Sequence, residues 1–113
     1  MTAVADAVDR GREAFRASAW IDASERLMAA RAEGPLTVED LERLAVACYL
    51  GGRDEDADAA WTRAHQDRLR SGDERGAARC AFWLAFGLMG RGDMARAGGW
   101  LARAERLVEQ QGE

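Results

Sequence analysis

The chain has 113 residues, a length typical of one domain, and it contains 24 Ala, 16 Arg, one Pro and no Lys. The high content of helix-forming residues argues against a β-sandwich. Hydrophobic residues make up 48% of the chain and charged residues 32%, a composition that argues against disorder. The formal charge is −4 and the arginines alternate with acids, which argues against a nucleic-acid-binding surface because phosphates demand a basic surplus.

Turn residues divide the chain into six stretches of helical length, each with apolar residues three and four positions apart. Thr37 and Asp40 resemble a capping box in which Asp replaces the usual Glu. Asp54, Asp73 and Asp93 each open a stretch, where a carboxylate accepts hydrogen bonds from unpaired N–H groups. The predicted helices cover residues 3–17, 20–32, 38–50, 54–70, 74–89 and 93–110.

A repeated pattern of small and large apolar residues predicts how these helices pair. Ala, a large apolar residue and Ala recur at Ala23/Leu27/Ala30, Ala57/Trp61/Ala64 and Ala97/Leu101/Ala104. Five residues before each occurrence stands a turn residue: Ser18, Gly52 or Gly92. The first two occurrences are 34 residues apart, the period of the tetratricopeptide repeat, and the next step is 40 residues. We place the six extra residues around 68–73, as a longer helix end and loop.

The pattern therefore predicts an all-α fold with a single domain over residues 1–113. Three tetratricopeptide-like hairpins, at about 4–37, 38–71 and 78–111, would stack as a short right-handed superhelix.

Two segments carry a resemblance to a known family: GAARCAFWLA at 76–85, and RGD at 91–93 followed by GWLARA at 99–104. They resemble the tetratricopeptide-like N-terminal region of bacterial LuxR-type transcriptional regulators, and the likeness extends over nearly the whole chain. In those regulators the repeats precede a C-terminal helix-turn-helix domain, which this sequence does not contain. The resemblance implies a regulatory or oligomerisation arm that makes no direct contact with nucleic acid. The chain would then be a fragment of a longer regulator or a small stand-alone repeat protein.

In tetratricopeptide folds the first helix of each hairpin lines a concave face, so the resemblance implies a partner-binding groove. An apolar floor flanked by Arg and Glu suits a peptide or an amphipathic helix. Core packing of Phe82, Phe86 and Met89 is an equal alternative, because aromatic residues at helical spacing are usually buried. The predicted groove residues are Arg12, Phe15, Arg16, Glu39, Glu42, Val46, Tyr49, Arg79, Phe82, Phe86 and Met89.

The last predicted helix has an apolar stripe that is broader than one neighbouring helix would cover. It includes Trp100, Leu107 and Val108. Solenoids need a terminal cap with a polar outer face. We therefore expect this uncapped C-terminal face to pack on further repeats or on a second copy of the chain.

No combination of residues in the sequence predicts catalysis, a metal site or a cofactor. His65, the single histidine, has no triad-like partner, so we expect no enzymatic activity. The acidic stretch 54–58 has Ala59 and His65 where a calcium loop needs Gly and Glu. Cys48 and Cys80 are predicted to be buried, reduced thiols, with a disulfide or redox pair as the alternative. The chain has neither a signal peptide nor a membrane-spanning run, so a cytoplasmic location is expected.

These observations predict a module that binds a protein, a peptide or a second copy of itself. The alternative is a sensor of a small apolar ligand, in which Tyr49, Phe82, Trp83 and Phe86 line a pocket. A co-chaperone adaptor is less favoured, because the Lys/Asn clamp of chaperone-binding repeats is absent.

Overall fold

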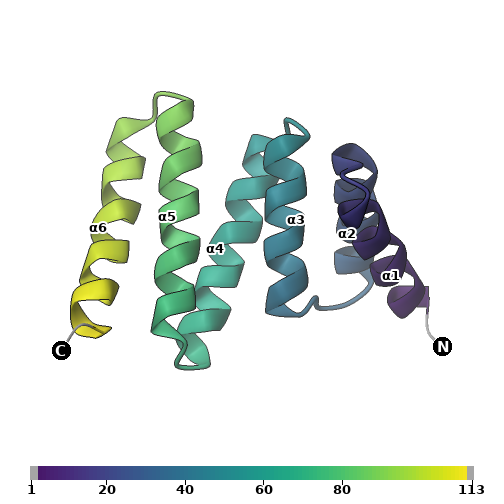
Figure 1. Ribbon diagram of the computed structural model, residues 1–113, viewed down its shortest axis with the longest axis horizontal. Helices are drawn as coiled ribbons and strands as arrows, with labels where there is room; N and C mark the ends of the chain where they lie inside the picture. Colours follow the sequence, from purple (N-terminus) through teal and green to yellow (C-terminus); the bar gives the residue numbers. More distant parts are fainter. Residues whose placement is uncertain (1–2, 112–113) are drawn as a thin grey trace. The chain divides into compact units, whose positions relative to one another are not determined.

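The protein is built of α-helices. The computed structural model describes residues 3–111, which form six helices and no strand (Figure 1). The predicted all-α class is therefore confirmed, and each predicted helix boundary lies within one residue of the observed one. The helices are α1 (Ala3–Arg16), α2 (Trp20–Glu33), α3 (Val38–Leu50), α4 (Asp54–Arg70), α5 (Glu74–Gly90) and α6 (Met94–Gln111).

Three of the helix starts have the caps that the sequence predicts. Thr37 Oγ1 accepts a hydrogen bond from the backbone N–H of Asp40 (3.2 Å) at the start of α3. Asp73 Oδ1 accepts one from the N–H of Gly76 (2.9 Å) in α5, and Asp93 Oδ1 one from Arg96 (3.3 Å) in α6. Each cap satisfies an N–H group that has no partner inside the helix.

Four of the connections between helices share one geometry. Each is three residues long, contains one residue in the left-handed region, and returns the next N–H to the carbonyl five residues earlier, as in a Schellman motif. Glycine tolerates this conformation because it has no Cβ, but one of the four positions is a serine. The left-handed residues are Ser18 (φ 59°), Gly52 (83°), Gly72 (80°) and Gly92 (81°).

Around residues 68–73 the sequence predicts a longer helix end and a longer loop, and of these the structure has the helix end, because α4 continues to Arg70, but not the loop. Residues 71–73 form a turn as short as the other three, with Asp73 N–H bonded to Arg68 O at 2.9 Å. The extra residues instead lengthen α4 and α5, which have 17 residues each, against 14 in α2 and 13 in α3. Because Gly72 adopts the left-handed conformation, the turn needs only three residues, and the added residues belong to α4 and α5.

The chain divides into two compact units, residues up to 60 and residues from 61, and the boundary falls within α4. In the first unit, α1 and α2 form a hairpin and α3 packs on it. Leu27 and Ala23 of α2 are fully buried there, and a Cβ added to Gly11 of α1 would lie 2.7 Å from the Leu27 side chain. Small residues thus allow close helix approach, as the repeated pattern predicts. In the second unit, α5 and α6 form a hairpin, and Leu84 and Leu88 of α5 are buried.

Candidate functional site

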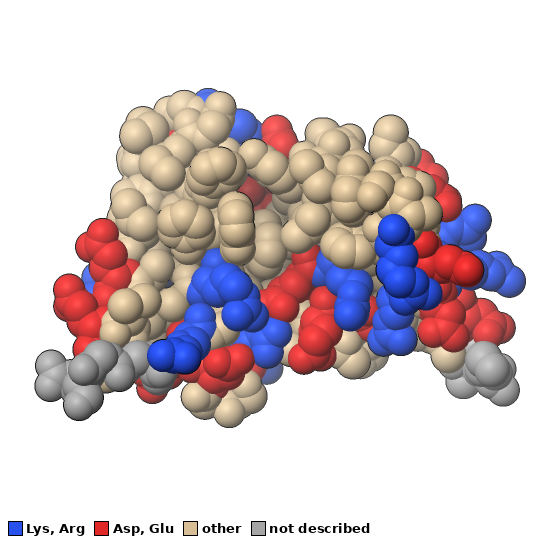
Figure 2. Space-filling view, in the orientation of Figure 1, with Lys and Arg blue, Asp and Glu red and all other residues tan. Residues whose placement is uncertain are grey.

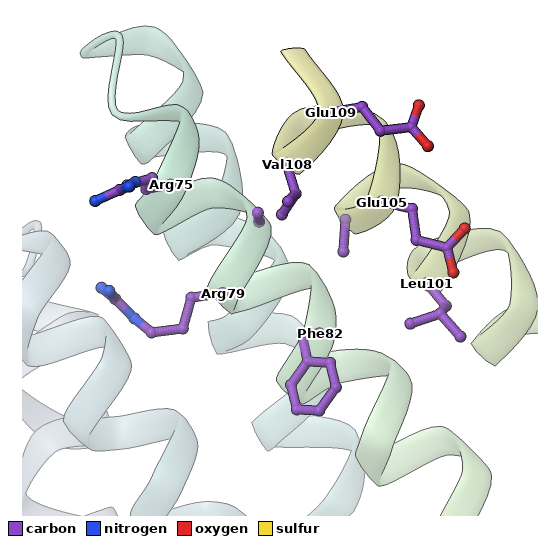
Figure 3. A pocket seen from close by; sticks show the side chains of 9 residues that line it. Arg75, Arg79, Phe82, Leu101, Glu105, Val108 and Glu109 are labelled. Carbon is purple, nitrogen blue, oxygen red and sulfur yellow. The ribbon is translucent and has the colours of Figure 1, made fainter. Parts of the chain in front are cut away.

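A groove of about 710 Å³ lies between α5 and α6, within the second unit (Figure 3). Its floor is apolar and comes from both helices: Ala78, Phe82, Leu101, Ala104 and Val108. The two alanines are nearly buried, whereas Val108 is 60% exposed. The groove is therefore open to solvent and has a floor on which an apolar side chain could pack.

Two rows of opposite charge border this groove. Arg75 and Arg79, one helical turn apart, belong to α5, while Glu105 and Glu109, also one turn apart, belong to α6. Figure 3 shows the two arginine side chains directed to one side of the groove and the two glutamates to the other. Because α5 and α6 form an antiparallel hairpin, the start of α5 lies beside the end of α6. Both charged rows are thus at the same end of the groove.

Three aromatic side chains of α5 form an exposed cluster that continues from the groove floor. The ring centroids of Phe82 and Trp83 are 5.4 Å apart, those of Trp83 and Phe86 5.7 Å, and those of Phe82 and Phe86 6.5 Å. These side chains are 43%, 44% and 45% exposed, and Met89, one turn further on, is 37% exposed. The alternative that Phe82, Phe86 and Met89 fill the core is therefore wrong. Over the α5/α6 hairpin, Figure 2 shows mainly uncharged side chains at the end near the 91–93 turn.

The other predicted groove residues lie in the first unit and do not line the α5/α6 groove. Phe15 is half-buried, with its ring edge-on to Trp20 at 5.2 Å. Arg16 and Glu39 are exposed, Glu42 and Val46 are half-buried, and Tyr49 is 42% exposed at the end of α3. Of the predicted groove residues, Arg79 and Phe82 line the α5/α6 groove, and Phe86 and Met89 follow on the same helix.

Arg12 makes an ion pair that the sequence did not predict. Its guanidinium donates to both carboxylate oxygens of Asp40, from Nε to Oδ1 at 2.9 Å and from Nη2 to Oδ2 at 2.7 Å. Arg43 Nη1 donates to Oδ1 at 2.8 Å, and the Thr37 hydroxyl to Oδ2 at 3.1 Å. Burial raises the pKa of Asp40, but the hydrogen bonds from Arg12, Thr37 and Arg43 outweigh it, so the pKa lies below its usual value. The predicted capping box is therefore half formed, because the carboxylate binds arginines.

The predicted C-terminal face divides between two environments. Trp100 is half-buried, with its ring edge-on to His65 at a centroid distance of 5.3 Å. The Arg103 guanidinium lies over the Trp100 ring, 4.5 Å from its centroid. Leu107 is half-buried beside His65 in a small hollow on α4 and α6. Val108, in contrast, lies in the α5/α6 groove.

The His65 side chain, in α4, contacts the backbone of α5 within the second unit. Its buried ring places Nδ1 2.8 Å from the carbonyl oxygen of Ala77, which can only accept, so Nδ1 carries the proton. The ring therefore fastens α4 to α5.

Both cysteines are buried free thiols, as predicted. Burial, with the negative charge of Asp56 adding to it, raises the pKa of Cys48 to about 11. Among residues 3–111, no group of three or more His, Cys, Asp or Glu side chains is placed to hold a metal ion. Nor is any helix in that range both long enough and apolar enough to cross a membrane.

The chain matches no protein-family model, no curated protein and no solved structure. The resemblance to tetratricopeptide repeats and to LuxR-type regulators therefore stays a prediction.

Six residues of the groove were not among the predicted site residues: Arg75, Ala78, Leu101, Ala104, Glu105 and Glu109. The sequence contains a signal for the three charged residues among them. Arg75 and Arg79, and likewise Glu105 and Glu109, are like charges four residues apart, which place one sign of charge along one side of a helix.

Proposed function

We propose that this chain is a protein-interaction module. Its partner would bind to the α5/α6 groove and to the exposed aromatic cluster that adjoins it. The observation that carries the proposal is the exposed cluster of Phe82, Trp83 and Phe86. Aromatic side chains dominate the energetics of protein interfaces, and contiguous exposed apolar patches mark interaction sites on soluble proteins. A cluster of three on one helix is therefore best explained by a partner that covers it.

The adjoining groove supports a helical partner. Its apolar floor would receive the apolar side of an amphipathic helix, with anchors three and four residues apart. The flanking arginines and glutamates would then set the direction of that helix, because charges at the edge of an interface mainly determine orientation and partner choice.

The resemblance to LuxR-type regulators supports a more specific role. In a transcriptional regulator of that type, the chain would serve as the regulatory or oligomerisation arm and act through protein contacts. The net charge of −4 supports a role without direct nucleic-acid contact.

A sensor of a small apolar ligand is the second candidate. The volume of the groove, about 710 Å³, is in the range of small-molecule sites. Of the four side chains expected to line such a pocket, only Phe82 does so, which favours the protein partner.

Site-specific photo-crosslinking tests the proposal. The amino acid benzoylphenylalanine replaces Phe86 in one variant and Gln66, an exposed residue of α4, in the control variant. Both are expressed in the source cell and irradiated, and the products are identified by mass spectrometry. We expect a discrete protein adduct from position 86 that position 66 does not give.

Two results would count against the proposal. If position 86 gives no adduct beyond that of position 66, no protein covers the cluster. If native mass spectrometry of the purified chain instead finds a retained small molecule, which Val108→Arg removes, the sensor is correct.

A further inference from the structure

We propose that the α5/α6 groove binds the same groove of a second copy of this chain, in a two-fold symmetric pair of helical hairpins. The inference rests on the proposed function and names the partner. It follows from the positions of the two charged rows, because the surface they border is complementary to itself.

A two-fold axis parallel to α5 and α6 places opposite charges against each other on both sides of the groove. Such an axis places α5 of one copy over α6 of the other, at the same height along the helices. Arg75 and Arg79 then face Glu105 and Glu109 of the second copy, and the symmetry repeats the contact on the other side. This match is possible because both rows lie at the same end of the hairpin.

The apolar floors meet in the same arrangement. Ala78 and Ala104 are small, so the opposing helices can approach closely, while Phe82 and Val108 project from the floor and lose their exposure. The helices facing each other across the interface run antiparallel. The result is a four-helix arrangement in which each copy contributes one hairpin.

A single partner helix matches the two charged rows of the groove less well than a second copy of the chain does. It would need acidic residues along one flank and basic residues along the other, whereas a second copy supplies both by symmetry.

The size of the surface sets the expected affinity. Two helices of 17 and 18 residues are each about 26 Å long and about 10 Å across, so they present roughly 500 Å². A pair would bury about 1,000 Å², near the lower limit of specific interfaces, so we expect a dissociation constant in the micromolar range.

Charge reversal provides the test. The acidic variant carries Arg75→Glu with Arg79→Glu, and the basic variant carries Glu105→Arg with Glu109→Arg. All four side chains are exposed, so both variants should retain the wild-type circular dichroism. Sedimentation equilibrium measures self-association. We expect wild type to dimerise and each variant to associate at least about tenfold more weakly.

Mixing the two variants isolates the proposed symmetry. In the mixture, glutamates on α5 of the acidic variant face arginines on α6 of the basic variant, and the other side is complementary too. We therefore expect the equimolar mixture to form a heterodimer at about the wild-type affinity. A general effect of altered charge would not restore association. The matched control carries Arg10→Glu with Arg16→Glu, which makes the same charge change on α1 and should leave dimerisation unchanged.

Three results would overturn the inference: a wild type that stays monomeric up to about 1 mM, a dimer that tolerates both the acidic variant and Val108→Arg, or variants whose mixture does not associate. The crosslinking experiment distinguishes the failure of self-pairing from the failure of the proposed interaction function. An adduct from position 86 to another protein, with none to a second copy, would retain the interaction module and reject self-pairing.

Discussion

Arg12 and Asp40 are joined by two parallel hydrogen bonds, of 2.9 and 2.7 Å, which link α1 to α3 across 28 residues of sequence. Asp40 is 1% exposed, so its carboxylate has lost nearly all contact with water. Arg43 and Thr37 supply the remaining donors. A buried carboxylate is tolerated when its oxygens are fully hydrogen-bonded. This cluster therefore fixes the position of α3 on the first hairpin.

Asp40→Asn should destabilise the protein strongly. The amide cannot balance two guanidinium groups, but Arg12 and Arg43 are 37% and 39% exposed, so we expect the loss of these charged hydrogen bonds to cost about 1–3 kcal/mol. Urea unfolding followed by circular dichroism measures the effect. The control is Asp22→Asn, which removes the exposed pair between Asp22 and Arg26 and should cost less than about 0.5 kcal/mol. Equal effects of the two substitutions would show that the cluster adds no stability.

The same cluster should make stability depend on acidity. The pKa of Asp40 is lower in the folded protein than its unfolded value of about 3.9. The unfolded chain therefore takes up the proton first, so the contribution is complete above about pH 5 and is lost as the pH falls through the folded value. Urea midpoints of wild type and Asp40→Asn, measured from pH 7 to pH 2, should converge at the acid end. A difference between the two urea midpoints that stays constant with pH would show that ionisation of Asp40 does not cause the effect.

The fold could be predicted closely because its signals are local. Gly72 and Gly92 mark turns by their own conformational freedom, and Thr37 caps the helix that follows it. The role of Asp40 could not be predicted in this way. Its position three residues after Thr37 indicates a cap, while its main partner, Arg12, is 28 residues distant and is one of 16 arginines. Nothing local distinguishes that arginine from the others.

Gly11 and Gly98 should respond in opposite directions to substitution by alanine. A Cβ at Gly11 would lie 2.7 Å from the buried Leu27 side chain, and such overpacking costs about 1–3 kcal/mol. A Cβ at Gly98, in α6, would meet nothing within 4 Å, so Gly98→Ala should stabilise the helix by about 0.5–1 kcal/mol. Thermal unfolding of both variants measures the signs. A stabilising Gly11→Ala would show that α1 and α2 do not need this close approach.

Ser18→Gly should stabilise the first turn. Ser18 has φ 59°, where the other three turns have glycine, and a Cβ is unfavourable in this conformation. We expect a gain of about 0.5–1 kcal/mol in the free energy of unfolding. Ser71→Gly serves as the control, because Ser71 precedes the left-handed residue of its turn and its hydroxyl donates to Arg68 O. That control should be neutral or slightly destabilising, and a matching gain there would rule out the conformational explanation.

Cys48 should react slowly while the protein is folded. With its pKa near 11, about one thiol in a thousand is ionised at pH 8, and burial limits access further. In a Cys80→Ala variant, a disulfide-exchange reagent should label Cys48 at least about a hundredfold faster in urea than in buffer. Equal rates would show that the first unit opens readily.

The candidate site was harder to predict than the fold. Phe82 and Phe86 have the spacing of a helix face, but that spacing is the same whether the face meets a core or solvent. The groove also needs Val108 and Glu105, which lie on α6, more than twenty residues beyond Phe82 in the chain. The tetratricopeptide resemblance directed the predicted site toward first helices and so away from α6.

The turn at Ser18 also bears on how the protein is made. It closes with hydrogen bonds between residues no more than five apart, so the hairpin of α1 and α2 needs only residues up to Glu33. Seven residues later comes Asp40, the partner of Arg12. A ribosome that releases the chain from its N-terminus thus delivers a complete hairpin first and the residue that secures α3 next, so that assembly can follow the order of synthesis.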